Sequence, residues 1–171
     1  SIDDYLKSLE MIGKAEKFMP ENYARIAQLT QRSNQFNLRT MRYSEADIQA
    51  IAENENFLTM SLHLKDKFGD HGLVSVVILE KKNEQEVFVD TWLMSCRVLK
   101  RGMEEYVVNK IVKLARAHGF KKITAEYIPT PKNAMVEKIN EKMGCMNVGE
   151  NNYALGVDSY KDQVSYINEE E

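Results

Sequence analysis

The stretch TWLMSCRVLKRGMEEYVVNKIV, Thr91–Val112, joins two different hydrophobic patterns. Its first part continues an apolar run that is typical of a strand, and its last part has apolar residues at the i, i+3, i+4 spacing of an amphipathic helix. Between them lie one cysteine, one glycine and three basic residues: Cys96, Gly102, Arg97, Lys100 and Arg101. The stretch therefore predicts a strand, a cationic turn and a helix that packs on a sheet.

Such a turn is suited to bind an anion. The first N–H groups of a helix have no partner within the helix, and the helix dipole is positive at that end. Lys100 and Arg101 would add formal charge. The turn thus suits a phosphate or pyrophosphate group. The alternative is a solvated basic loop that balances Glu104 and Glu105.

The residues before the turn predict the antiparallel part of a sheet. FLTMSLHL and GLVSVVILE flank the turn-rich KDKFGDHG, which predicts a hairpin with a long loop, and EVFVDTWLM predicts the next strand. FNLRTMRY also alternates like a strand. A short helix should follow it, because Ser44 and Asp47 nearly match a capping box.

The residues after the turn predict one more strand and one more helix. KKITAEYI reads as a strand, and Thr130 can cap a helix whose first residue is Pro131. The inward face of that helix should carry Met135, Val136, Ile139 and Met143. CMNVGENNYALGV indicates weak final strands, and the polar tail from Ser159 is expected to fray.

The chain as a whole predicts an α/β (α+β) protein with an N-terminal addition. Two helices are expected near the N-terminus, at about residues 5–9 and 20–30. We therefore divide the chain into a helical extension and linker, residues 1–35, and an α/β domain, residues 36–171.

Composition and charge exclude several classes of function. A net charge of −3 without a basic stripe argues against a nucleic-acid-binding protein. There is neither a long apolar run nor a secretory signal, so we expect a cytoplasmic protein that does not enter membranes. The two cysteines lack CxxC spacing and no histidines stand at i, i+4, so no metal site is expected. The start at Ser1, without Met, suggests a piece of a longer protein.

The order of elements resembles the GNAT acetyltransferase fold. DTWLMSCRVLKRGMEEYVV is similar to the GNAT pyrophosphate-binding turn, with Arg97 at its first position, Lys100 in place of the first glycine and Gly102 as the second. The resemblance implies that a pantetheine arm lies between EVFVDTWLM and KKITAEYI, with its phosphate near the N–H groups of Arg101 to Met103. It also implies that Asn133 holds the arm, although a polar residue next to Pro131 is common in the first turn of a helix.

Five segments resemble the C-terminal half of FkbH-like proteins: YLKSLEM, RIAQLTQRSNQFNLRTMRYSEADI, DKFGDHGLVSVVIL, LMSCRVLKRGMEEYVV and YIPTPKN. These enzymes load a glyceryl unit onto an acyl carrier protein for methoxymalonyl and related extender units. The resemblance implies a 1,3-bisphosphoglycerate donor, a carrier-bound phosphopantetheine or coenzyme A, and an upstream HAD-like domain with a DxDxT motif, which is not present in this sequence.

Cys96 is the candidate nucleophile, because it resembles the SCR position of that family. A free thiol is only a few per cent ionised at neutral pH, and neighbouring cations and a helix N-terminus favour the thiolate. Arg97, Lys100 and Arg101 would act in this way. The alternative is an inert buried cysteine.

Other polar residues are weaker candidates. In KFGDHG, Asp70 and His71 are catalytic candidates, because histidine titrates near neutrality and can act as a base. The alternative is that both residues only form a turn. Asp90 lies within an apolar strand, as a structural ion-pair partner or as a base. Substrate-binding candidates are Asn34, Gln35, Asn37 and Thr130, although amides that pin a linking segment explain SNQFN equally well.

One position departs from the resemblance. FkbH-like proteins and many GNAT enzymes have a tyrosine before EKxG as the acid for the departing thiolate, whereas this chain has Asn140, which cannot act as an acid. Two alternatives to a glyceryl transferase stay open: an acetyl-CoA-dependent N-acyltransferase, against which Asn140 argues, and a non-catalytic module that docks a carrier protein.

Overall fold

The computed structural model describes residues 1–171, which are built around one mixed sheet. Its strands are β1 (Ile12–Glu16), β2 (Phe57–Asp66), β3 (Gly69–Lys81), β4 (Glu86–Met94), β5 (Lys122–Glu126), β6 (Met146–Gly149), β7 (Asn152–Gly156) and β8 (Asn168–Glu169). The helices are α1 (Ile2–Ser8), α2 (Tyr23–Arg32), α3 (Glu45–Glu53), α4 (Met103–Ala117) and α5 (Ile139–Lys142), with short 3-10 turns η1 (Pro20–Asn22), η2 (Cys96–Val98) and η3 (Ala134–Val136).

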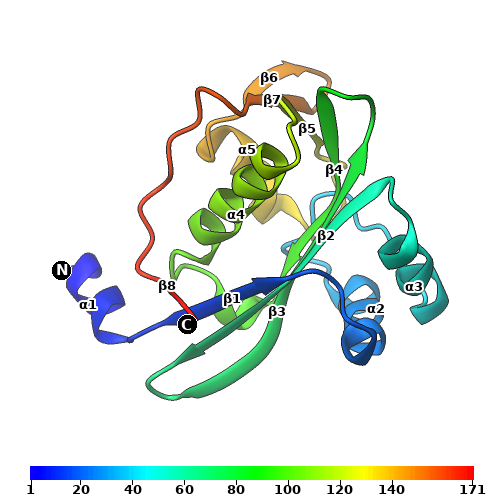
Figure 1. Ribbon diagram of the computed structural model, residues 1–171. Coiled ribbons are helices and arrows are strands. Elements are labelled where there is room, and N and C mark those ends of the chain that lie inside the picture. Colours follow the sequence, from blue (N-terminus) through cyan, green and yellow to red (C-terminus); the bar gives the residue numbers. More distant parts are fainter.

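The eight strands lie in the order β6-β7-β5-β4-β3-β2-β1-β8, and helices cover both faces of the sheet (Figure 1). α4 packs on one face in a core that includes Val74 and Val77 of β3. α2 and α3 pack on the other face against Val76 and Ile78 of the same strand. β3 therefore contributes to two hydrophobic clusters, which explains why its sequence is apolar almost without interruption.

The central elements match the sequence predictions. β2, β3 and β4 are antiparallel, α4 follows β4, and β5 is parallel to β4. Ser44 caps α3 in a capping box with Asp47. The predicted long hairpin loop is wrong, because β2 and β3 continue to Asp66 and Gly69 and leave only two residues between them.

The sequence predicts a helical extension over residues 1–35, but the structure places a strand within it. β1 lies within it and pairs with β2 in the central sheet, from Ile12 opposite Lys65 to Glu16 opposite Ser61. The division of the chain at residues 35 and 36 stays a prediction, but the sheet begins before it. The predicted strand FNLRTMRY is also wrong, since only Asn37 forms an isolated bridge there, with Leu93.

The last third of the chain differs from the predictions at two places. The helix expected after Thr130 is divided into η3 and α5, and Met135 is 53% exposed instead of facing inward, whereas Val136, Ile139 and Met143 are buried as expected. The tail does not fray, because β8 pairs with β1, Ile167 is buried, and Asn109 on α4 exchanges hydrogen bonds with the Gln163 backbone.

Candidate active site

Strands β4 and β5 diverge soon after they begin. They pair only over Glu86–Phe88 and Lys122–Thr124, so the second half of β4 has no partner on β5. The segment that lies there is the connector between α2 and α3, residues 33–44. The gap between these strands is the predicted location of a pantetheine arm, so the connector decides what can bind.

The connector hydrogen-bonds to both sides of the gap. The Leu38 N–H donates to the Trp92 main-chain oxygen at 3.4 Å, and the Met94 N–H donates to the Phe36 oxygen at 3.1 Å. Across the gap, the Ile128 N–H donates to the Leu38 oxygen at 2.9 Å. Phe36 and Leu38 are buried, and the Phe36 ring packs edge-on against Trp92 with 5.0 Å between centroids. The connector therefore occupies the position of an additional strand.

Charged side chains fasten the connector. Arg39 donates to Glu126 Oε1 at 3.1 Å and to the main-chain oxygen of Asp90 at 2.9 Å. The Tyr43 hydroxyl donates to Asp90 Oδ2 at 2.7 Å, and Thr91 Oγ1 donates to the same oxygen at 2.9 Å. Burial, followed by the hydrogen bond to Asp90 and its charge, raises the pKa of Tyr43. The sequence left Asp90 as either a structural ion-pair partner or a base. In the structure Asp90 has the partners that the first of these interpretations requires.

Asn133 also holds the connector. Its amide donates to the main-chain oxygens of Asn37 and Ile128 at 2.9 and 3.0 Å and accepts from the Thr130 N–H at 2.8 Å and the Tyr127 hydroxyl at 3.3 Å. The side chain is fully buried. All of its donors are therefore in use within the protein, and its predicted role in holding a pantetheine arm stays a prediction.

The turn before α4 has the conformation that a tight strand-to-helix turn needs. Lys100 and Gly102 have positive φ of 62° and 83°, and Gly102 is the residue before the helix. Its backbone lies against the C-terminal tail, where the Ser165 hydroxyl donates to the Gly102 oxygen at 3.1 Å. Met103, the first helical residue, is fully buried.

The basic side chains of the turn are partly engaged. Arg101 donates to Asp66 Oδ2 at 2.7 Å, and His71 Nε2 lies 2.8 Å from the same oxygen. Arg97 donates to the His71 main-chain oxygen at 3.4 Å. Burial acts to raise the pKa of Asp66, but the hydrogen bonds from His71 and the Phe68 N–H, with the charges of His71 and Arg101, lower it overall. These contacts fasten the β2–β3 hairpin to the turn.

Asp70 does not join His71. It is exposed, and its carboxylate accepts from the Gly72 N–H within the hairpin turn at 2.7 Å. His71 is held by Asp66 instead. The acidic partner of His71 is therefore Asp66, whereas the sequence interpretation had paired His71 with Asp70.

Glu104, in the first turn of α4, carries a buried carboxylate. Burial raises its pKa, and the charge of Glu105 adds to this, while the backbone N–H groups of Glu104 and Lys100 and the Lys142 ammonium act in the opposite direction. Its Oε1 has no hydrogen-bond partner. An acidic side chain therefore lies beside the N–H groups that a phosphate at this turn would use, which makes the turn a poor fit for pyrophosphate.

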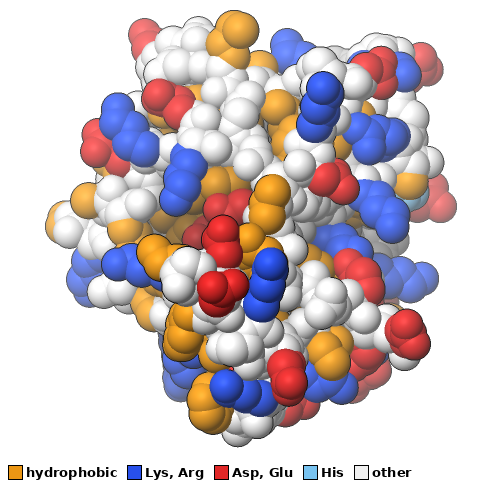
Figure 2. Space-filling model, turned by 90° about the vertical axis from the view of Figure 1, so that its left-hand side faces the viewer, with side chains coloured by type: hydrophobic (Ala, Val, Ile, Leu, Met, Phe, Trp, Pro, Cys, Tyr) orange, Lys and Arg blue, Asp and Glu red, His pale blue; other side chains and the backbone are white.

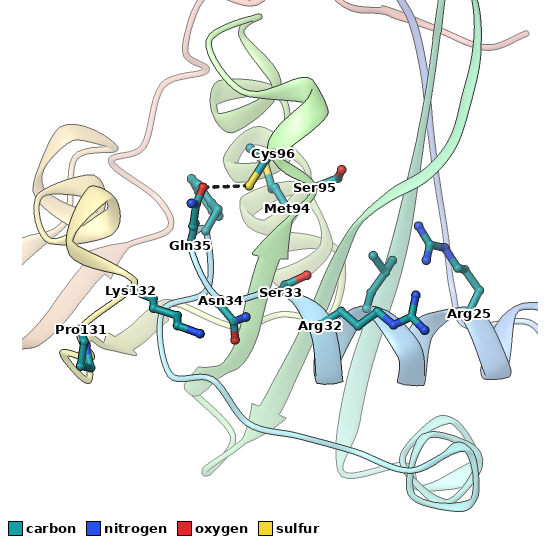
Figure 3. A pocket seen from close by; sticks show the side chains of 12 residues that line it. Arg25, Arg32, Ser33, Asn34, Gln35, Met94, Ser95, Cys96, Pro131 and Lys132 are labelled. Atoms are coloured by element: carbon teal, nitrogen blue, oxygen red, sulfur yellow. Dashed lines mark hydrogen bonds between the residues drawn. The ribbon is translucent and has the colours of Figure 1, made fainter.

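Cys96 opens onto a pocket of about 930 Å³ on the α2 side of the connector (Figure 3). The thiol is exposed, and Sγ donates to Gln35 Oε1 at 3.1 Å. In Figure 3, Arg25 and Arg32 project from α2, Lys132 points toward Asn34 from the loop after β5, and Cys96 faces Gln35. The pocket thus combines a thiol, two amides and three cations.

Of the predicted substrate-binding residues, Asn34 and Gln35 line this pocket. Asn37 is buried and pins the connector, donating to the Ser33 oxygen and accepting from the Thr40 N–H at 2.9 Å. The Thr130 hydroxyl accepts from the Lys132 and Asn133 N–H groups, as in a capped turn. The roles of all four in substrate binding stay predictions.

Lysine and arginine side chains are interspersed with acidic ones on the face seen in Figure 2, without a continuous basic stripe. No group of three or more histidine, cysteine, aspartate or glutamate side chains is placed to hold a metal ion. None of the helices has the length and apolar character needed to cross a membrane.

No protein-family model matches the sequence, and no curated protein is similar to it. Solved structures are similar in shape. The GNAT domain of S. lividans PAT aligns with a TM-score of 0.62 at 13% identity, covering 83% of this chain and 89% of that one. This chain has the GNAT fold. Spermidine N-acetyltransferase from Vibrio cholerae, in complex with CoA and spermine, gives 0.65 at 10% identity (85% and 96%), and ribosomal-protein-S18-alanine N-acetyltransferase from Escherichia coli gives 0.62 at 11% (90% and 99%).

The predicted GNAT fold is thereby confirmed, whereas nothing in these likenesses points to FkbH-like proteins in particular.

Asn140 stands where the resemblance led us to expect a tyrosine. It is buried, and its Nδ2 has no partner. Burial is the chief cause that raises the pKa of the Tyr127 and Tyr153 hydroxyls. Asn140 therefore leaves this position without a side chain that could protonate a departing thiolate.

The sequence interpretation of this GNAT fold missed three residues of the pocket. Arg25 and Arg32 lie on a helix for which only the apolar face was considered, and Lys132 follows Thr130 and Pro131 without having been singled out. One signal could have found the arginines: their seven-residue spacing places both on one face of α2, with Leu29 between them.

Proposed function

We propose that this chain is an acyltransferase domain that carries an acyl group on Cys96 and passes it to the thiol of a phosphopantetheine arm. The observation that carries the proposal is the exposed Cys96 thiol, at the end of β4, opening onto a pocket large enough for a small acyl substrate. Gln35, 3.1 Å from the sulfur, is placed to orient it. Serving as a nucleophile requires such access, which an inert buried cysteine lacks.

The chemistry proceeds in two balanced steps. The Cys96 thiolate attacks the carbonyl carbon of an acyl phosphate, forming the S–C bond and releasing phosphate with the bonding electron pair. The pantetheine thiolate then attacks the thioester carbonyl, and Cys96 leaves as a thiolate. Because both acyl compounds are thioesters of similar energy, the second step needs no further activation.

The finer assignment rests on the FkbH-like resemblance. The acyl unit would be glyceryl, the donor 1,3-bisphosphoglycerate, the acceptor an acyl carrier protein, and the product a precursor of methoxymalonyl-type extender units. A HAD-like domain would process the donor within the full protein. A cytoplasmic location is part of the same proposal.

The alternative is acetyl-CoA-dependent N-acylation of an amine, and two of the similar structures are named as N-acetyltransferases. Two features of this chain disfavour it. The connector fills the gap between β4 and β5, and Asn140 cannot protonate a departing thiolate. Acetylation of an amine by acetyl-CoA with this chain alone would favour the alternative.

The test is acylation of the thiol. The protein, with its upstream part where there is one, is incubated with 1,3-bisphosphoglycerate and examined by intact mass and peptide mapping. We expect an acyl adduct on Cys96 and transfer to an acyl carrier protein, both lost in Cys96→Ala and retained in the control Cys145→Ala. Carrier loading at the wild-type rate by Cys96→Ala would overturn the proposal.

A further inference from the structure

We infer that the phosphopantetheine arm reaches Cys96 through the pocket beside α2, with its phosphate bound by Arg25, Arg32 and Lys132, and not along the gap between β4 and β5. The inference deepens the proposed function and rests on it. The sequence resemblance instead places the arm in the gap between β4 and β5 and its phosphate at the turn before α4.

The gap is closed by the protein's own chain. An arm lying between the strands would have to break the hydrogen bonds that join Phe36 to Met94 and Leu38 to both Trp92 and Ile128. It would also expose the buried side chains of Phe36 and Leu38. The arm could replace some of the main-chain bonds, but it could not restore this burial.

The turn before α4 is a poor phosphate site in this structure. Arg101 is already paired with Asp66, and the carboxylate of Glu104 lies in the first turn of the helix. A phosphate placed here would compete with one carboxylate for the arginine and be repelled by the other. Arg97 and Lys100 form no ion pair, so the turn offers two cations beside these two carboxylates, whereas the pocket beside α2 is lined by three cations and no carboxylate.

The pocket beside α2 has cations without acidic partners. None of Arg25, Arg32 and Lys132 forms an ion pair. Their side chains make one hydrogen bond, from Arg25 to Gln28. The two arginines lie on one face of α2, roughly 10 Å apart along the helix. Lys132 approaches from the opposite wall (Figure 3). Three unpaired cations around a path to a thiol suit an anionic group on a long arm.

Thiol–disulfide exchange tests the route without requiring acyl transfer. The Cys96 thiolate attacks the pantetheine sulfur of a 2-pyridyl disulfide, forming a mixed disulfide and releasing 2-thiopyridone, whose absorbance gives the rate. Phosphopantetheine pyridyl disulfide is compared with the pantetheine form, which lacks the phosphate. We expect the phosphate to accelerate labelling of Cys96 about tenfold at low salt, with the advantage shrinking as salt screens the charges.

Charge-neutral variants locate the phosphate. Arg25→Gln combined with Arg32→Gln should abolish the advantage, so that both reagents label at the same rate, and the rate with the uncharged reagent reports any separate effect on the thiol. Lys113→Gln combined with Lys121→Gln removes the same charge from other parts of the surface and should retain it. If instead Lys100→Gln with Arg101→Gln abolishes the advantage and the α2 variant keeps it, the phosphate binds at the turn and the inference is wrong.

Amide hydrogen exchange of the labelled protein reports on the gap. We expect the Met94 and Ile128 amides to exchange as slowly after labelling as before. Faster exchange at both would show that the arm displaces the connector, which would overturn the inference. Pyridyl disulfides of coenzyme A and of a phosphopantetheinylated carrier protein distinguish the two sources of the arm, and the one with the stronger dependence on Arg25 and Arg32 is the natural ligand.

The two proposals fail separately. If Cys96 is acylated by the donor but the α2 variant keeps the full phosphate advantage, the route is wrong and the function stands. If the advantage depends on Arg25 and Arg32 but no acyl adduct forms on Cys96, the proposed function is wrong and the anion site stands.

Discussion

The main-chain N–H of Met94 donates to the main-chain oxygen of Phe36 at 3.1 Å, so the connector takes a hydrogen-bonding group of β4 that faces away from β3. Strand edges bind extended ligands through such groups. In this protein the connector occupies that strand edge. How tightly the connector is attached can therefore be measured by the hydrogen exchange of the amides that it binds.

Tyr43→Phe should loosen the connector. The hydroxyl donates to Asp90 Oδ2 at 2.7 Å, and its loss should cost about 1.4 kcal/mol. If the connector opens as a local unit, the Met94 amide should exchange roughly tenfold faster in the variant, as measured by hydrogen exchange. Tyr5→Phe, at an exposed tyrosine, is the control. Unchanged exchange at Met94 in Tyr43→Phe would mean that Tyr43 does not hold the connector.

Asn133→Ala should be among the most destabilising polar substitutions. It leaves the oxygens of Asn37 and Ile128 and the N–H of Thr130 without their partner in a buried site. We expect a loss of about 3 kcal/mol in the free energy of unfolding, measured with urea. Asn152→Ala removes one exposed bond to the Glu150 oxygen and should change it by less than about 0.5 kcal/mol. Equal effects would contradict the buried role.

Asp66→Asn should change how stability depends on pH. The pKa of Asp66 is lowered in the folded protein, so its ionised form contributes stability that is fully present above the unfolded value and is lost as pH falls through the folded value. The difference between wild type and variant, about 1 kcal/mol at pH 7, should therefore shrink as the pH is lowered below about 4. Urea unfolding across this range measures it.

The control for that experiment is Asp158→Asn, whose ion pair with Lys121 is exposed. It should show little pH-dependent difference from wild type. A constant gap between wild type and Asp66→Asn at every pH would show that the carboxylate charge is not what Arg101 and His71 recognise.

The two thiols should react at very different rates. Cys96 is exposed, whereas burial raises the pKa of Cys145 to about 11, so roughly one Cys145 in a thousand is ionised at pH 8. Iodoacetamide at pH 8 should alkylate Cys96 at least about 100-fold faster than Cys145. Peptide mapping over time measures both rates, and urea-unfolded protein, in which the two should react alike, is the control. Comparable rates in the folded protein would refute the assigned burial.

Gly13→Ala should be destabilising through a clash. A Cβ at this position would lie 2.7 Å from Ile167 Cγ2 and 2.8 Å from Tyr106 Cζ. We expect a loss of about 1–3 kcal/mol in the free energy of unfolding, and a smaller loss when Ile167→Ala is already present. At Gly156 the same change meets only the flexible Ser159 hydroxyl, so Gly156→Ala should be milder. Strict additivity of Gly13→Ala and Ile167→Ala would exclude the contact.

The sequence predicts the centre of this fold well because β3, β4 and α4 carry their own periodicity. It could not predict β8, which has only two polar residues and joins β1 through main-chain pairing. FNLRTMRY alternates like a strand, but it is held by side chains such as Asn133 that lie far away in the sequence.

The candidate site was predictable in part for the same reason. Cys96 and its neighbouring turn are local in sequence, and Gln35 was a candidate whose contact with Cys96 only the fold reveals. The pairing of Arg101 with Asp66 depends on how far β2 extends, which hydrophobic periodicity does not fix. Because arginine is charged, the sequence by itself indicates only that Arg25 and Arg32 lie on the solvent-exposed face of the helix. The fold shows that this face lines the pocket.

The pairing of β8 with β1 has a consequence for the protein during its synthesis. β1 is synthesised well before β8, so the outer edge of β1 has free N–H and C=O groups until β8 has left the ribosome. An open strand edge is a template for association with another chain. The few residues around β8 thus shield the sheet, and a chain truncated before Asn168 should aggregate even though it keeps all of its buried core residues, Ile167 included.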